Sequence, residues 1–149
     1  MLYSYFVKKL IRQSFDHVNN HRWDALLKAG APRVHHRFAG AHALGGERHD
    51  KEALRRWFER LGRVLPNLHI KVNNIWVNGW PGHTTVFAQW DGTATLLNGT
   101  SYVNRGLHVF TCGGAESMHS RNFKIHKQRP VLSPPKRLLA SKKLPPNKL

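Results

Sequence analysis

The residues best suited to acid–base chemistry alternate along one segment of the chain. Tyr102, Asn104 and His108 stand at even positions, so they share one face if the segment is a β-strand. An imidazole takes or gives a proton near neutral pH, and a phenol or an amide donates a hydrogen bond to an oxygen that gains charge. The set predicts proton abstraction beside a carbonyl, with His108 as base or donor and Tyr102 and Asn104 as donors. It equally fits a hydrogen-bonded core histidine beside a tyrosine and an asparagine that satisfy each other.

Five other side chains are candidates to surround a substrate. Phe110 follows His108 on the same predicted face, and Trp90 belongs to a neighbouring segment that alternates in the same way. Trp90 also fits the simpler role of a core residue. The predicted substrate-binding residues are Trp90, Phe110, His35, Phe38 and Trp57.

The sequence predicts no metal site and no cofactor. His35 and His36 are adjacent in a short predicted strand, so at most one of them points inward. No carboxylate or third histidine is spaced to join them as a metal ligand, and His42 and His49 lie nearby only in loop-like sequence. The single cysteine, Cys112, excludes an internal disulfide framework and a cysteine-based zinc finger.

The length and the N-terminus limit the class of protein. The chain has 149 residues, which suits one domain with one hydrophobic core. No stretch approaches the roughly 20 apolar residues of a membrane span. The first lysines follow the initial apolar run, and no small-residue cleavage site comes after them, unlike in a secretory signal. We therefore expect a cytoplasmic protein without a membrane partner.

Positive charge is concentrated at the end of the chain. The net charge is +16, and residues 113–149 carry 9 Lys and Arg against Glu116, whereas residues 1–112 carry 15 Lys and Arg against 7 Asp and Glu. The last segment also holds five of the eight prolines and shows no apolar period. We predict a domain over residues 1–112 and a basic, proline-rich, disordered tail over residues 113–149.

The periodicity of the domain predicts an α+β fold. Apolar residues at spacings of three and four predict helices over residues 2–19 and 22–29, and a third helix between the N-cap Asp50 and Pro66. Val34–Phe38 fits a short strand, and beyond Pro66 a period of two predicts antiparallel strands over residues 68–79, 84–95 and 101–112. Both faces of these strands carry apolar residues, so we expect one to meet the helices and the other a partner subunit.

Four short sequence motifs, in this order, carry a resemblance to a known family. They are Phe38-Ala39-Gly40 with His42-Ala43-Leu44-Gly45-Gly46, Trp57-Phe58-Glu59-Arg60-Leu61 with Leu65-Pro66, Gly79-Trp80-Pro81 followed by Thr84, and Tyr102-Val103-Asn104-Arg105-Gly106-Leu107-His108-Val109. Over residues 3–111 the chain resembles the SnoaL-like, polyketide cyclase-like group of the nuclear transport factor 2-like superfamily. The resemblance implies a cone-shaped fold, with three N-terminal helices packed on a strongly curved antiparallel sheet and, here, the irregular basic tail after it.

The resemblance implies a small-molecule protein without choosing a reaction. The superfamily includes cyclases, isomerases, dehydratases, epoxide hydrolases and non-catalytic partner-binding modules. The family match puts His108 at the position of an active-site histidine and implies a homodimer. We expect a cofactor-independent binder or enzyme that holds an apolar, oxygenated ligand in a closed cone. The alternatives are a partner-binding module of the same fold and a protein whose tail contacts nucleic acid nonspecifically.

The resemblance stops at Thr111. Relatives continue with a strand reading roughly Leu-Arg-Trp-Gly, nine further residues and Asp-Thr-Gln, and SnoaL-like cyclases use that aspartate as the acid–base carboxylate. Residues 112–149 contain one acid, Glu116, so we expect any activity to be impaired. A reading frame that starts at the third base of the Thr111 codon permits both motifs, Leu-Arg-Trp-Gly and Asp-Thr-Gln, at the spacing found in relatives. Our hypothesis is that residues 112–149 are read out of frame, which sequencing of the coding DNA tests.

Overall fold

The computed structural model describes residues 1–113 and 117–124, and the α+β class is confirmed for this part of the chain. The elements follow in the order α1 (Leu2–Asn19), α2 (Trp23–Ala29), β1 (Arg33–Phe38), β2 (Gly46–Arg48), α3 (Lys51–Val64), β3 (His69–Trp80), β4 (His83–Thr95), β5 (Ser101–Gly113) and β6 (Ser117–Lys124). The predicted helices agree with these bounds within one residue.

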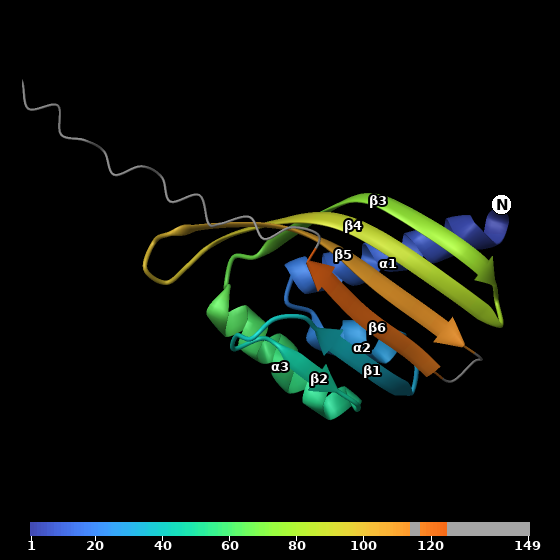
Figure 1. Ribbon diagram of the computed structural model, residues 1–149, viewed down its shortest axis with the longest axis horizontal. Coiled ribbons are helices and arrows are strands. Elements are labelled where there is room, and N and C mark those ends of the chain that lie inside the picture. Colours follow the sequence, from blue (N-terminus) through green and yellow to red (C-terminus); the bar gives the residue numbers. More distant parts are fainter. Residues whose placement is uncertain (114–116, 125–149) are drawn as a thin grey trace, which may run out of the picture.

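The described strands form one sheet in the order β2-β1-β6-β5-β4-β3. Short turns join β3, β4 and β5, which pair antiparallel as predicted. Helices α1 and α2 lie behind the strands in the view of Figure 1, and α3 lies beside β2 at the edge opposite β3. Within the described ranges, the helices therefore leave one face of the β3–β5 part of the sheet uncovered.

Local sequence explains where the helices start and stop. In α1 the buried residues Ile11 and Phe15 are one turn apart and pack against β3–β5. Helix α3 begins where the Asp50 carboxylate accepts a hydrogen bond from the backbone N–H of Ala53 at 2.7 Å. It ends before Pro66, which lacks the N–H that a further turn needs.

A glycine in β5 makes room for a tryptophan of β4. Gly106 lies opposite Trp90 in the register of the two strands. A Cβ atom at position 106 would come within 2.7 Å of Cε2 of the Trp90 ring, closer than carbon atoms approach one another. The absence of a side chain at Gly106 thus lets the buried indole lie flat over its neighbour strand.

One pair of neighbouring strands is parallel, whereas the sequence predicted an antiparallel sheet. β1 runs parallel to β6, so the sheet is mixed and not purely antiparallel. The reason is the connection: α3 and four strands separate β1 from β6, and so long a link permits either direction. The short strand β2, which pairs antiparallel with β1, lies in a segment that the glycine-rich sequence left without a prediction.

The sequence predicted an irregular tail after residue 112, but residues 117–124 form a strand. β5 extends to Gly113, and β6 follows it and pairs with β5 on one side and β1 on the other. Without β6, the backbone N–H and C=O groups of β1 and β5 at this place would be unpaired, and such groups favour a strand between them whatever its side chains. The rest of the predicted tail, residues 114–116 and 125–149, lies outside the described residues.

Candidate functional site

A large cavity lies between the helices and the sheet. Its volume is about 820 Å³, within the range of small-molecule sites, and most of its lining is aliphatic or aromatic. No Asp or Glu is among the described residues that line it. Its polar lining includes four imidazoles, those of His17, His36, His42 and His108.

His108 enters the cavity from the middle of β5. Its ring stacks on Phe110, with centroids 4.3 Å apart and planes at 13°, and meets the edge of Phe15 at 6.1 Å. The surrounding protein strips water from the ring and lowers the pKa of His108 to about 4, because burial disfavours the charged form. At neutral pH His108 is therefore an uncharged imidazole that both donates and accepts a hydrogen bond.

His36 is the second buried imidazole of the cavity. It lies on β1, 3% exposed, with its ring 4.6 Å from Trp57 and 6.4 Å from His108. Burial is the main cause that lowers the pKa of His36 to about 3, and the positive charges that His108 and Arg48 carry when protonated lower it further. The two strands thus bring together a pair of neutral histidines.

Three buried nitrogen atoms of the lining have no hydrogen-bond partner within the described part of the chain. They are Nδ1 of His17, Nδ1 of His36 and Nε1 of Trp90. Buried polar atoms normally have a partner, because leaving one unpaired costs about 1–3 kcal/mol. Their position at one cavity indicates that water or a ligand supplies the missing bonds.

Tyr102 and Asn104 bond to each other. The Asn104 amide donates to the Tyr102 hydroxyl at 3.0 Å. Tyr102 lines the cavity, whereas the buried Asn104 is not part of its lining. Burial raises the pKa of Tyr102, and the bond from Asn104 acts in the opposite direction. Asn104 therefore holds the phenol in place and does not itself face the cavity, which matches the simpler interpretation of this residue.

Four of the five predicted substrate-binding residues line the cavity, and one does not. Trp90, Phe110, Phe38 and Trp57 belong to the lining. His35 does not: its Nε2 atom lies 3.1 Å from Oε2 of Glu47.

Of the two adjacent histidines, His36 lines the cavity and the predicted residue His35 does not. Alternation along β1 shows that only one of His35 and His36 faces inward, and the burial pattern of the strand selects His36. Two other lining residues, His17 and His42, were not predicted from the sequence. The position of His17, next to Val18 on the apolar face of α1, was a signal that could have found it.

The chain shares its fold with solved structures of the nuclear transport factor 2-like class. A protein of that class from Burkholderia pseudomallei is 15% identical to this chain, with a TM-score of 0.68 over 78% of this chain and 88% of its own. The chain belongs to the SnoaL-like domain family, whose model matches residues 11–115.

Two further solved structures share the fold. SalBIII, described as an epoxide hydrolase/cyclase-like enzyme in pyran ring formation of salinomycin, is 18% identical, with a TM-score of 0.64 over 78% of this chain and 88% of its own. RV0760c from Mycobacterium tuberculosis, solved with estradiol-17β-hemisuccinate, is 16% identical, with a TM-score of 0.63 over 75% and 88%. Identities this low establish the fold and no common activity. No curated protein matches the chain.

No helix in the described ranges combines the length and the apolar character that crossing a bilayer requires.

Proposed function

We propose that the cavity binds an apolar small molecule that carries carbonyl or hydroxyl oxygens. The observation that carries this proposal is an apolar cavity of about 820 Å³ with partnerless nitrogen atoms of His17, His36 and Trp90 in its lining. A fused-ring ligand of steroid size suits that volume, and its oxygens would satisfy the buried nitrogens. The strongly curved, cone-shaped sheet implied by the family resemblance would exclude water around such a ligand.

The histidines favour hydrogen bonding over removal of a proton. An imidazole with a pKa of about 4 is a weak base at neutral pH, so His108 is poorly suited to deprotonate carbon. A neutral imidazole instead donates a hydrogen bond to a carbonyl or epoxide oxygen and stabilises charge that develops there. Tyr102, held by Asn104, stands six residues before His108 on β5, about 20 Å along the strand, so it is a donor to a second oxygen of the ligand. Reactions without a cofactor, such as cyclisation, isomerisation, dehydration or epoxide opening, need such donors.

Among the described residues, the cavity has no carboxylate that could act as a base, and this also favours binding over catalysis. The described lining holds no Asp or Glu, and the sequence of β6, Ser117–Lys124, contains neither. We therefore expect any reaction that depends on a strong carboxylate base to be impaired. Binding is accordingly the central part of the proposal, and catalysis through His108 is its extension.

Ligand binding is measured by quenching of tryptophan fluorescence, since Trp57 and Trp90 both line the cavity. Estradiol-17β-hemisuccinate, the compound in the RV0760c structure, is the first probe. We expect saturable quenching, and at least tenfold weaker binding after His36→Phe, because one hydrogen bond of about 1.4 kcal/mol is lost. His69→Phe, a change at an exposed histidine of β3, is the control. Absence of binding by apolar oxygenated probes, or equal affinity in the variant and the control, would contradict the proposal.

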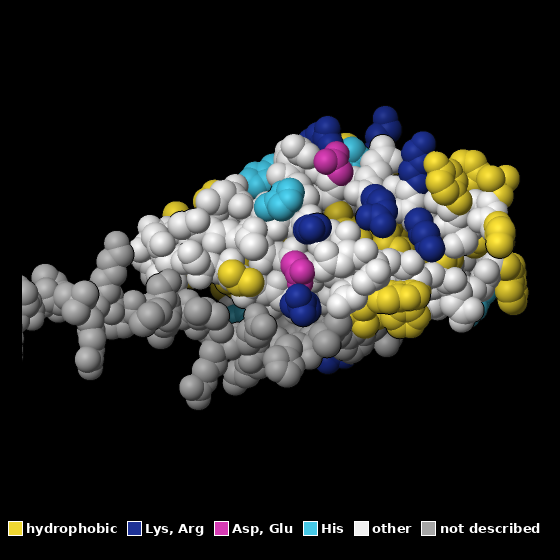
Figure 2. Space-filling model, turned by 90° about the horizontal axis from the view of Figure 1, so that it is seen from above, with side chains coloured by type: hydrophobic (Ala, Val, Ile, Leu, Met, Phe, Trp, Pro, Cys, Tyr) yellow, Lys and Arg dark blue, Asp and Glu magenta, His cyan; other side chains and the backbone are white. Residues whose placement is uncertain are grey.

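We also infer that the uncovered face of the sheet contacts a second copy of the chain. Trp76 is 52% exposed and lies opposite Phe87, which lies opposite Val109, so one apolar row crosses three strands. Exposed hydrophobic side chains also gather at the end of the molecule that carries the start of α1 and the β3–β4 turn (Figure 2). A contiguous apolar surface of this kind is typical of an interface.

Sedimentation velocity tests the dimer. Trp76→Lys is expected to give a monomer with unchanged circular dichroism, because it places a charge in the middle of the apolar row. Leu97→Lys, a change at an exposed apolar residue of the β4–β5 turn, is expected to leave the dimer intact. A monomeric wild-type chain would refute this inference without touching the cavity proposal.

A further inference from the structure

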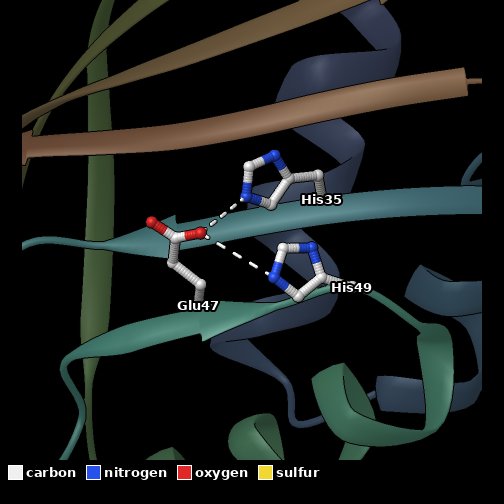
Figure 3. A group of neighbouring side chains, drawn as sticks. All are labelled: His35, Glu47 and His49. Atoms are coloured by element: carbon white, nitrogen blue, oxygen red, sulfur yellow. Dashed lines mark hydrogen bonds and ion pairs between the residues drawn. The ribbon is translucent and has the colours of Figure 1, made fainter.

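Two histidines and a glutamate meet on the side of β1 away from the cavity. His35 lies on β1, Glu47 on β2, and His49 follows β2 directly (Figure 3). Oε2 of Glu47 lies 3.1 Å from Nε2 of His35 and 3.8 Å from Nε2 of His49. One ligand atom from each residue falls within a group whose members are all within 4.8 Å of one another.

Strand pairing explains why these three side chains lie close together. In the antiparallel register Arg37 lies opposite Glu47 and His36 opposite Arg48, so His35 and His49 face each other one step further on. Alternate residues share a face, which puts His35, Glu47 and His49 together on the side away from His36. The two imidazole rings stack, with centroids 4.6 Å apart and planes at 19°.

We propose that His35, Glu47 and His49 bind a divalent transition-metal ion, with zinc as the representative. In tetrahedral zinc sites with bonds of about 2.0–2.1 Å, neighbouring ligand atoms lie about 3.3 Å apart. The two distances from Oε2 of Glu47 bracket this value, and all three ligand atoms lie within 4.8 Å of one another, so rotation of the side chains would bring them to an ion. Imidazole nitrogen and carboxylate oxygen are ligands that zinc accepts, and water takes the fourth position.

The surroundings leave the carboxylate available to an ion. Arg37 approaches the other oxygen of Glu47, with Nε 3.5 Å from Oε1, so Oε2 is the atom turned to both histidines. The side chains of His35, Glu47 and His49 are 27%, 43% and 71% exposed, so an ion reaches them from solvent without unfolding. The hydrogen bond between His35 and Glu47 is exchanged for two metal bonds, and the protons on the ligating nitrogens leave to solvent.

A metal here would connect three segments that build one end of the cavity. His35 precedes His36 of the cavity lining, and His49 precedes Asp50, the N-cap of α3. The segment between β1 and β2 carries His42 and Leu44, which also line the cavity. Metal binding is therefore expected to stabilise this end of the fold, since a ligand that binds only the folded state raises the unfolding temperature.

The test is calorimetric titration of zinc chloride into the full chain, prepared without an affinity tag and treated with EDTA. We expect one ion per chain and a higher unfolding temperature with zinc. His49→Asn should weaken binding at least tenfold, and Glu47→Gln should also weaken it. Cobalt(II) in place of zinc should give the visible absorption of a tetrahedral site, lost in His49→Asn.

His69→Asn, at an exposed histidine of β3 far along the sequence, is the matched control and should bind zinc like the wild type. Circular dichroism shows whether each variant folds. His49→Asn is the cleaner variant, because this side chain is the most exposed of the three. Absence of saturable binding to the wild-type chain, or equal affinity in His49→Asn and His69→Asn, would overturn the proposal.

Discussion

The buried imidazole of His108 makes the stability of the protein depend on pH. Its pKa is about 4 in the folded chain and 6.5 in an exposed histidine, so the unfolded state binds the proton more readily. Between these values stability falls as the pH falls. The pKa difference of about 2.5 corresponds to about 3 kcal/mol, most of which is lost by pH 4. Above pH 6.5 the group has no effect on the pH dependence.

His108→Phe isolates this contribution, because phenylalanine keeps the stacking on Phe110 and removes the proton site. The free energy of unfolding is measured with urea at several values between pH 7 and pH 4.5. The wild-type chain should lose at least 2 kcal/mol more than the variant over this interval. The carboxylates contribute equally to both, and His36, without a protonated His108 beside it, loses no more stability in the variant than in the wild type. Parallel pH profiles would refute the reasoning. A native His108 pKa near 6.5, measured by NMR titration of the ring proton, would refute it as well.

Three further substitutions test the packing around the cavity, each by urea unfolding at pH 7. Gly106→Ala should cost at least about 2 kcal/mol and change the near-ultraviolet circular dichroism of Trp90, because the added Cβ overlaps the indole ring; an unchanged spectrum would contradict this. Trp57→Phe should cost about 1–3 kcal/mol, since it removes the buried 2.8 Å bond from Nε1 to the Leu44 carbonyl; a loss no larger than experimental error would mean that this bond adds nothing. Asp50→Ala should cost about 1 kcal/mol through the lost N-cap of α3, whereas Asp50→Asn, which keeps an acceptor oxygen, should cost less; equal losses would exclude the cap as the cause.

Periodic segments with clear ends were predictable from sequence. In α1 the apolar stripe that contains Ile11 and Phe15 continues over four turns, and in α3 Asp50 and Pro66 mark both ends. β2 and β6 lack such signals. β2 is three residues long, and β6 exists because β1 and β5 leave backbone groups to pair on both sides of it. Strands that depend on their neighbours for pairing cannot be recognised from their own side chains.

In the candidate site, too, a local sequence pattern predicted some residues and could not predict others. Tyr102, His108 and Phe110 were found because alternation within one strand puts them on one face. Alternation also separates His35 from His36, but it does not say which of them faces the cavity, and the choice depends on the side from which the helices cover β1. The grouping of His35 with Glu47 depends on pairing across 12 positions of sequence, which no local pattern reveals.

The two sides of β1 explain why its adjacent histidines have opposite properties. His36 faces the cavity, where burial lowers its pKa to about 3 and keeps it neutral. His35 faces outward, where a carboxylate and a second histidine replace the apolar surroundings. A small molecule that needs hydrogen bonds in a dry site matches the first environment, and a cation that needs basic ligands and access from solvent matches the second. A ligand held by His36 and an ion held by His35 would both fix β1, so each should strengthen the binding of the other. Zinc should then increase the affinity for estradiol-17β-hemisuccinate in the wild-type chain but not in His49→Asn, and the absence of that difference would show that the two sites are independent.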